Sequence, residues 1–463
     1  MKAPGRYYSY WEQIILGDCS KTMKIDGADL TPEEKREKRF REWLKTDWKF
    51  DSPAAETAYQ TRIKRLADTL LYKKTDRVPV TLPVDNFPAL YAGSTFHKVM
   101  YDYDELYRAW KKFLLDFDMD SFVGPGMVYP GRVFDIVDYK LYAWPGHGLP
   151  LSAPGHQFVE GEYMMPDEYD AFLSDPSDYA MRVFLPRALG TLAPFRKLPQ
   201  LSSLLGRPQS LLMTLGQPDI QAAFQSLVDA GKEMARYQQV VMKFGREAQA
   251  AGFPSMRGGV AMAPFDTLGD ALRGTKGVIM DIYRRPDKVL KAVDVIADFA
   301  IKNTIESVNA MGGVMVTFPL HKGDDTFMSG AQFEKFYWPS LKKYILALID
   351  EGIMVSLFAE GKYNNRLEQV KTLPTGWILW HFDQTDMVKV KQVLGNTQCL
   401  AGNVPTSLMC TGTPEAVKEY CRKLIELCSK DGGYILTGGA SASEVKVENL
   451  RAMMAAAKEY GVN

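Results

Sequence analysis

Short apolar stretches in the second half of the chain end in acids, a histidine or an amide, the side chains that move protons or hold metal ions. The polar residues at these ends are His321, Asp324, Asp325, Glu360, His381 and Asn403. A helical pattern follows nearly every stretch, and alternating strand and helix predicts a parallel sheet. If that sheet closes into a barrel, the strand ends meet at one mouth. We therefore expect one shared site there.

Glu360 and His381 end successive predicted strands. Neighbouring strands lie about 4.8 Å apart, so side chains at adjacent ends can bind one ion. We predict a metal site on Glu360 and His381, with His321 or Asp325 as the third ligand. The alternative is that Glu360 accepts hydrogen bonds from a loop and His381 is a satisfied core histidine.

The segment after the strand that precedes His321 carries two adjacent aspartates, Asp324 and Asp325. Carboxylates at a barrel mouth can be metal ligands, general bases or anchors for a cation. Aspartates also cap turns. We expect one of the two to cap the turn and the other, taken as Asp325, to face the pocket as a catalytic group beside His381.

The elements that position these residues are eight strands with intervening helices, which predict a (β/α)8 barrel, an α/β fold. The expected strands are Val78–Pro83, Ser121–Gly124, Ser255–Ala261, Gly313–Phe318, Ile353–Phe358, Trp377–His381, Gln398–Ala401 and Gly433–Leu436. The sequences Thr31-Pro-Glu-Glu34 and Ser329-Gly-Ala-Gln332 are capping boxes, which begin helices.

Two further regions lie outside the strand order. Residues 1–60 are predicted to form an N-terminal helical extension with a helix from Pro32 to Lys49, and residues 61–463 the barrel. Residues 126–250 are predicted to be a long insertion after the second strand. They are too apolar to stay disordered.

Composition narrows the class of protein. Apolar residues make up 46% of the 463 residues, and the 56 basic side chains equal the 56 acidic ones. Zero net charge argues against nucleic acid or an anionic membrane as the main partner. The five cysteines form no C-x-x-C pair, and the N-terminal residues do not resemble a signal peptide, so we expect a cytoplasmic protein. A homodimer is possible.

Several short sequence segments together resemble those of the uroporphyrinogen decarboxylase superfamily. In order, they are Asp76-Arg77-Val78-Pro79-Val80, Gly323-Asp324-Asp325, Phe333-Glu-Lys-Phe-Tyr-Trp-Pro339, Gly402-Asn403-Val404-Pro405, Gly412-Thr413-Pro414-Glu415 and Glu448-Asn449-Leu450-Arg451. The resemblance spans roughly residues 60–463 and implies a (β/α)8 barrel. The superfamily contains decarboxylases and methyltransferases that work with corrinoid proteins.

The decarboxylases carry arginines after the first strand, which grip tetrapyrrole carboxylates. Here that segment, Pro83–Gly93, has no arginine, so such a substrate would be left unpaired. The thiol-methylating members bind zinc through two cysteines, and the corresponding segments here, Phe358–Gly361 and Gly438–Ala440, have none. A zinc site would have to be rebuilt from oxygen and nitrogen, which suits an oxygen-bearing substrate.

The resemblance therefore suggests the methyltransferase component of a corrinoid-dependent O-demethylase, acting through zinc on a methoxylated small molecule, which we expect to be aromatic. The chain has no D-x-H-x-x-G motif, so the corrinoid would be carried by a separate partner protein. The alternative is a metal-independent decarboxylase or lyase of a small cyclic or aromatic acid. The expected substrate-binding residues are Asp85, Phe87, Tyr91, Phe96 and Asn403, with Tyr129 and Trp144 from the insertion.

Overall fold

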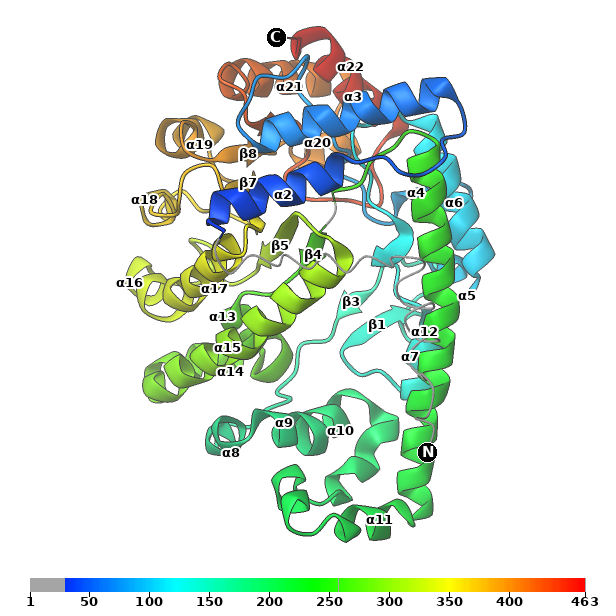
Figure 1. Ribbon diagram of the computed structural model, residues 1–463, viewed down its shortest axis with the longest axis vertical. Coiled ribbons are helices and arrows are strands. Elements are labelled where there is room, and N and C mark those ends of the chain that lie inside the picture. The colour runs from blue at the N-terminus through cyan, green and yellow to red at the C-terminus, as the bar shows by residue number, and fades with distance from the viewer. Residues whose placement is uncertain (1–29, 257, 463) are drawn as a thin grey trace, which may run out of the picture.

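The protein is a TIM barrel, here described from a computed structural model that covers residues 30–256 and 258–462 (Figure 1). Residues 1–29 of the predicted extension, with Cys19, lie outside the described part. Six parallel strands pair in sequence order. They are β4 (Gly258–Val260), β5 (Met315–Leu320), β6 (Met354–Ala359), β7 (Ile378–Phe382), β8 (Cys399–Ala401) and β9 (Tyr434–Ile435).

The first two predicted strands extend the wall as short parallel bridges. Val80 pairs with Leu436 beside β9, and Thr81 pairs with Ser121. Strands β5, β6 and β7 each begin and end within one or two residues of the bounds predicted from the sequence. They are almost wholly buried, as expected for strands covered on both faces.

Helices surround this wall, and several of them begin at residues whose side chains cap the helix N-terminus. Thr413 caps α21 (Pro414–Cys428) and Asp386 caps α19 (Met387–Leu394) with their side chains, and Ser329 forms the predicted capping box. The helices after β4 are α13 (Pro264–Asp266), α14 (Gly274–Arg284), α15 (Pro286–Met311), α16 (Gly330–Gln332), α17 (Trp338–Asp350), α18 (Leu367–Val370), α19 (Met387–Leu394), α20 (Thr406–Thr411), α21 (Pro414–Cys428) and α22 (Val447–Tyr460).

Two N-terminal helices, α2 (Pro32–Leu44) and α3 (Pro53–Leu70), lie across the barrel (Figure 1). The predicted capping box at Thr31 is present, but the helix ends at Leu44 and not near Lys49. Arg39 is completely buried and donates hydrogen bonds to the backbone carbonyls of Glu351 and Gly313. Because these carbonyls precede β6 and β5, α2 covers the amino-terminal side of the wall and leaves the opposite mouth free.

The segment between the second strand and β4 builds a separate lobe. Its long helix α12 (Pro218–Ala250) runs beside the barrel and reaches the small helices at the far end of the molecule (Figure 1). A three-stranded sheet of β1 (Tyr142–Pro145), β2 (Gly148–Leu149) and β3 (Gln157–Phe158) precedes these helices. The helices of this region and of the loop before it are α4 (Phe87–Tyr91), α5 (Phe96–Tyr101), α6 (Tyr103–Asp116), α7 (Gly131–Val137), α8 (Tyr169–Ser174), α9 (Pro176–Tyr179), α10 (Leu185–Ala188), α11 (Gln209–Leu215) and α12 (Pro218–Ala250).

Within residues 30–256 and 258–462, no helix combines the length and apolar character needed to cross a membrane.

Candidate functional site

A cavity of about 600 Å³ lies inside the barrel, with residues from all eight strand segments in its wall. Every described lining residue is uncharged. Most are apolar, and the remainder include one histidine and a set of hydroxyl groups. The hydroxyl-bearing residues are Thr81, Ser121, Ser255, Thr317, Ser356, Thr437 and Ser441, and the histidine is His381. The interior is therefore suited to a largely apolar ligand.

His381 lies in the cavity wall with a fixed orientation. Its ring stacks on Phe358 of the neighbouring strand, with ring centroids 4.5 Å apart. Its Nε2 lies 2.7 Å from the carbonyl oxygen of Gly438. A carbonyl only accepts, so Nε2 carries the proton and Nδ1 is a bare acceptor in the neutral ring. Burial lowers the pKa of His381, which keeps the ring neutral.

His321 and Glu360 form the polar pair at the rim. Strands β5 and β6 align Leu320 with Ala359, so the next residues on each strand lie side by side. His321 Nε2 is 3.7 Å from Glu360 Oε1, and His321 Nδ1 is 2.6 Å from Asp270 Oδ2. Phe358, two residues before Glu360, pairs with His381, so His381 lies one layer deeper in the barrel.

The charges of the rim depend on one another. Burial alone would lower the pKa of His321, but the hydrogen bond to Asp270 and the charges of Asp266 and Glu360 raise it to about 9. Desolvation raises the pKa of Glu360, the His321 charge opposes this shift, and the carboxylate of Asp383 adds to it. The rim without a metal ion is thus an imidazolium held among carboxylates.

A second group of residues supports this pair. The fully buried Asp266 accepts hydrogen bonds from the backbone N–H groups of His321 and Lys322, both at 3.0 Å, and from the hydroxyl of Tyr337 at 2.8 Å. The Lys322 ammonium lies 2.8 Å from Asp270 Oδ1. These contacts fix the exit of β5, so His321 has little freedom to turn away from Glu360.

Sequence reasoning missed Asp266 and Asp270. Both follow β4, four residues apart, in α13 and the π-helical turn Thr267–Leu272. Carboxylates four residues apart lie on one face of a helix. Two aspartates with this spacing directly after a strand could have indicated the site from the sequence.

The rim can be tested for its fit to zinc. Two ligands of a tetrahedral zinc ion with bonds of about 2.0–2.1 Å lie about 3.4 Å apart. The 3.7 Å between His321 and Glu360 is close to that spacing. A carboxylate on the other nitrogen of a metal-binding histidine, as Asp270 is here, is typical of zinc sites. Yet no group of three or more His, Cys, Asp or Glu side chains arranged to hold a metal occurs within the described residues. The rim supplies two ligands.

The two aspartates after His321 divide their roles differently from our expectation. Asp324 caps the turn as predicted, accepting from the backbone N–H groups of Thr326 and Phe327 at 3.1 and 2.8 Å. Asp325 does not line the cavity. Its Oδ2 accepts from the backbone N–H of Asn365 at 3.0 Å, and its Oδ1 lies 3.6 Å from Arg366. The buried guanidinium holds this carboxylate in a loop, so a catalytic role for Asp325 has no support in the geometry.

Asp85 lies where the first strand leaves the wall, beside the loop after β9. The Ser443 hydroxyl donates to Asp85 Oδ2 at 3.3 Å. Desolvation raises the pKa of Asp85, which the charge of His156 partly offsets. The centroid of the His156 ring lies 5.1 Å from the ring centroid of Tyr129 and 6.0 Å from that of the buried Phe96. Asp85, Phe96 and Tyr129 thus come together with His156, a residue that the sequence did not single out.

Phe87 and Tyr91 pack away from the cavity. Their rings stack at 5.6 Å, and Phe87 contacts Phe113 of α6 edge-on at 5.8 Å, while the Tyr91 hydroxyl donates to Asp116. The short helix α4 turns both rings toward α6, so they support the wall and do not contact a ligand in the cavity. Trp144 is also buried, 4% exposed, in the insertion.

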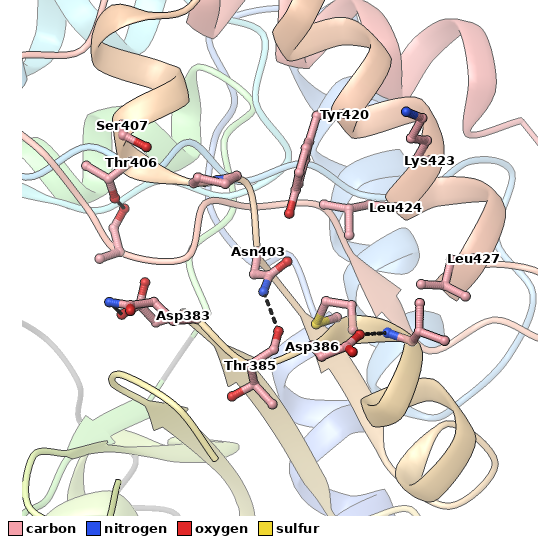
Figure 2. A pocket seen from close by; sticks show the side chains of 15 residues that line it. Asp383, Thr385, Asp386, Asn403, Thr406, Ser407, Tyr420, Lys423, Leu424 and Leu427 are labelled. Carbon is pink, nitrogen blue, oxygen red and sulfur yellow. Dashed lines mark hydrogen bonds between the residues drawn. The ribbon is translucent and has the colours of Figure 1, made fainter. Parts of the chain in front are cut away.

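Asn403 faces a different space. It lines a second recess of about 810 Å³ between the loops after β7 and β8 and helix α21. Figure 2 shows its amide pointing to Thr385, whose carbonyl oxygen accepts from Asn403 Nδ2 at 2.8 Å. Tyr420 and Lys423 border the same recess. The predicted contact of Asn403 with a substrate in the barrel is therefore corrected. Its side chain ties two loops together beside the mouth.

The chain belongs to the uroporphyrinogen decarboxylase family, whose model matches residues 212–460. Among solved structures, a methyltransferase from Methanosarcina mazei is similar, with a TM-score of 0.53 and 15% sequence identity over 87% of this chain and 98% of that chain. At this identity the likeness concerns the fold alone. No match is found among curated protein sequences.

Proposed function

We propose that the protein is the methyltransferase component of a corrinoid-dependent O-demethylation system. It would move a methyl group from a methoxylated aromatic small molecule to a corrinoid carried by a separate protein. The observation that supports this best is a cavity inside the barrel whose described lining residues carry no charge, together with the charged groups of the rim. A tetrapyrrole with many carboxylates would meet no counter-charge in that described lining, whereas an aromatic ether would be well solvated.

Zinc is the cofactor that we propose for the rim, where His321 and Glu360 would supply two of its ligands. Bound there, it would act as a Lewis acid toward the ether oxygen and stabilise a leaving phenolate. His321 Nε2 and Glu360 would hold it, and Asp270 would keep the imidazole in the required orientation. His381, one layer deeper with Nε2 engaged by Gly438, is left to contact the ring end of the substrate.

The corrinoid would come from outside the chain. The sequence has no D-x-H-x-x-G motif, the usual signature of a chain that holds cobalamin itself. We expect the purified protein to contain no stoichiometric cobalt and to need a corrinoid protein for turnover. Cobalt bound in one-to-one ratio would contradict this arrangement.

A metal-independent decarboxylase or lyase is the second candidate. The observation in its favour is the pKa of His321, raised to about 9, because an imidazolium is a proton donor at neutral pH. Metal content separates the two candidates.

The deciding experiment combines elemental analysis with demethylation assays in the presence of a corrinoid protein. We expect about one zinc per chain, and loss of demethylation after exhaustive chelation with recovery on adding zinc. Full activity in zinc-free protein would refute the metal mechanism and favour the lyase.

A further inference from the structure

A chain of charged side chains connects the insertion to the rim of the barrel mouth. Glu160, which follows β3 of the insertion, lies 3.7 Å from the ammonium of Lys322. Lys322 in turn lies 2.8 Å from Asp270 Oδ1, and the other oxygen of Asp270 lies 2.6 Å from His321 Nδ1. The insertion is therefore linked to His321 through two ion pairs and a hydrogen bond.

Lys322 is the centre of this chain. Its side chain is buried, 6% exposed, and its ammonium donates to the hydroxyl of Thr275 at 2.7 Å. The backbone N–H of Thr275 donates to Glu160 at 2.6 Å, which brings the carboxylate to the same place. Buried charges are screened less than exposed ones, so the two carboxylates beside Lys322 share its charge.

The path of the Lys322 side chain is fixed by close packing. A Cβ atom at position 269 would lie 2.6 Å from Lys322 Cε, and Gly269 leaves that space free. The ring of Phe327 lies on another side, with its centroid 5.3 Å from the ammonium. The ammonium therefore stays between Asp270 and Glu160.

The segment that carries Glu160 is also held by contacts that do not involve Lys322. The backbone N–H of Met164 donates to the carbonyl oxygen of Leu272 at 2.7 Å. Glu162 lies 3.5 Å from the guanidinium of Arg273. Removing the charge of Glu160 should therefore leave the segment in place.

Asp270 is shared between Lys322 and His321. Burial raises the pKa of Asp270, but the hydrogen bonds that His321 and Lys322 donate to it outweigh burial and lower the pKa. The more closely Lys322 pairs with Oδ1, the weaker an acceptor Oδ2 becomes for His321. A second carboxylate beside Lys322 relieves this competition.

We propose that Glu160 and Lys322 are positioning residues of the rim. Glu160 weakens the hold of Lys322 on Asp270, and Asp270 then holds the His321 ring more firmly in its orientation toward Glu360. The insertion thereby takes part in the electrostatics of the barrel mouth. This coupling rests on the charged chain alone, whereas its consequence for zinc rests on the proposed function.

Proton NMR of the metal-free protein tests the coupling directly. The proton between His321 Nδ1 and Asp270 should give a signal far downfield, which Asp270→Asn removes and so assigns. We expect Glu160→Gln to move this signal upfield, because Lys322 then pairs more fully with Asp270. We expect Lys322→Met to move it downfield, because the competing cation is gone. A loosened segment would not produce shifts of opposite sign.

Glu162→Gln is the matched control for Glu160→Gln. Both side chains lie on the same segment, but Glu162 pairs with Arg273. Glutamine at position 160 keeps an oxygen that can accept from Thr275, so the two variants differ in which cation loses its partner. The signal should stay in place in Glu162→Gln. An equal upfield shift in both variants would show that docking of the segment matters and not the charge, and would overturn the proposal. This comparison decides even if Lys322→Met does not fold.

Competition with a chelator measures the consequence for zinc. We expect Glu160→Gln to weaken zinc binding and Lys322→Met to strengthen it, each by about two- to fivefold, the effect of a partly exposed ion pair. The expected NMR shifts in a protein that binds no zinc would refute the proposed zinc site and support the coupling. An unchanged signal in a folded Glu160→Gln variant would overturn the coupling, whatever the zinc affinity.

Discussion

The cavity and the rim are built from the same strands and differ sharply in chemistry. Ser356 of β6 lines the cavity, whose described lining residues are uncharged, while Glu360, just after the end of β6, faces a histidine and other carboxylates. Side chains on one face of a strand recur every second residue, so consecutive layers inside a barrel can have different characters. The charge of the side chains therefore changes with depth in the barrel, within the same set of strands.

The sharpest test of the rim is Glu360→Gln. An amide carries no charge to offset a dication, so we expect loss of bound zinc and a fall in demethylation of about 1,000-fold or more. Metal analysis and rates with a corrinoid protein measure both. Glu368→Gln, at an exposed position on α18, is the control and should change neither. Full zinc occupancy in Glu360→Gln would show that the rim does not hold the metal.

The sharpest test of the cavity is Ser356→Asp. This substitution introduces a carboxylate among described lining residues that carry no charge. The buried Ser356 is 6% exposed, so the unpaired carboxylate should lower the free energy of unfolding by about 3–5 kcal/mol. Burial would raise the folded-state pKa of this carboxyl. The loss should therefore be small below about pH 4 and grow as the pH rises.

Urea unfolding of Ser356→Asp at several pH values, beside Ser356→Ala, measures this loss. The alanine variant should be nearly neutral and independent of pH. A stable Ser356→Asp variant at pH 8 would mean that the cavity tolerates charge and that the contrast with the rim is weaker than described.

Asp270→Asn tests how strongly the rim depends on residues behind it. The amide removes the charge that orients His321 and raises its pKa, so zinc affinity or activity should fall by about 10- to 100-fold. Competition with a chelator measures the affinity. Asp294→Asn, an exposed partner of Lys343, is the control. A wild-type affinity in Asp270→Asn would remove the carboxylate–histidine arrangement from the mechanism.

The smallest expected effect is that of Tyr337→Phe. The ring keeps its stacking on Phe333, and the hydroxyl that donates to Asp266 and also interacts with Tyr363 is lost. We expect a loss of about 1 kcal/mol in unfolding free energy and a modest loss of activity. Urea denaturation beside the exposed Tyr283→Phe checks it. A loss above about 3 kcal/mol would mean that the two backbone N–H donors do not suffice to stabilise the buried Asp266 without the Tyr337 hydroxyl.

Much of the barrel could be predicted from the sequence because its determinants are local. Apolar runs and capping residues such as Thr31, Ser329 and Thr413 define where strands and helices begin. The alternation of strand and helix then fixes a parallel order, and with it the gathering of His321, Glu360 and His381 on one side of the sheet. These features need only the residues within each element.

The roles of those residues depended on contacts between distant segments. Asp270 precedes His321 by 51 residues, and Gly438 follows His381 by 57. Asp325 lies beside Arg366, and Phe87 packs against α6. No spacing in the sequence indicates either contact. The sequence by itself determined that His321, Glu360 and His381 lie at the carboxyl ends of their strands, because strand direction and side-chain alternation are local properties. Only the tertiary structure decided which nitrogen of each histidine is free and which carboxylate is occupied, because each hydrogen bond depends on where the other segment lies.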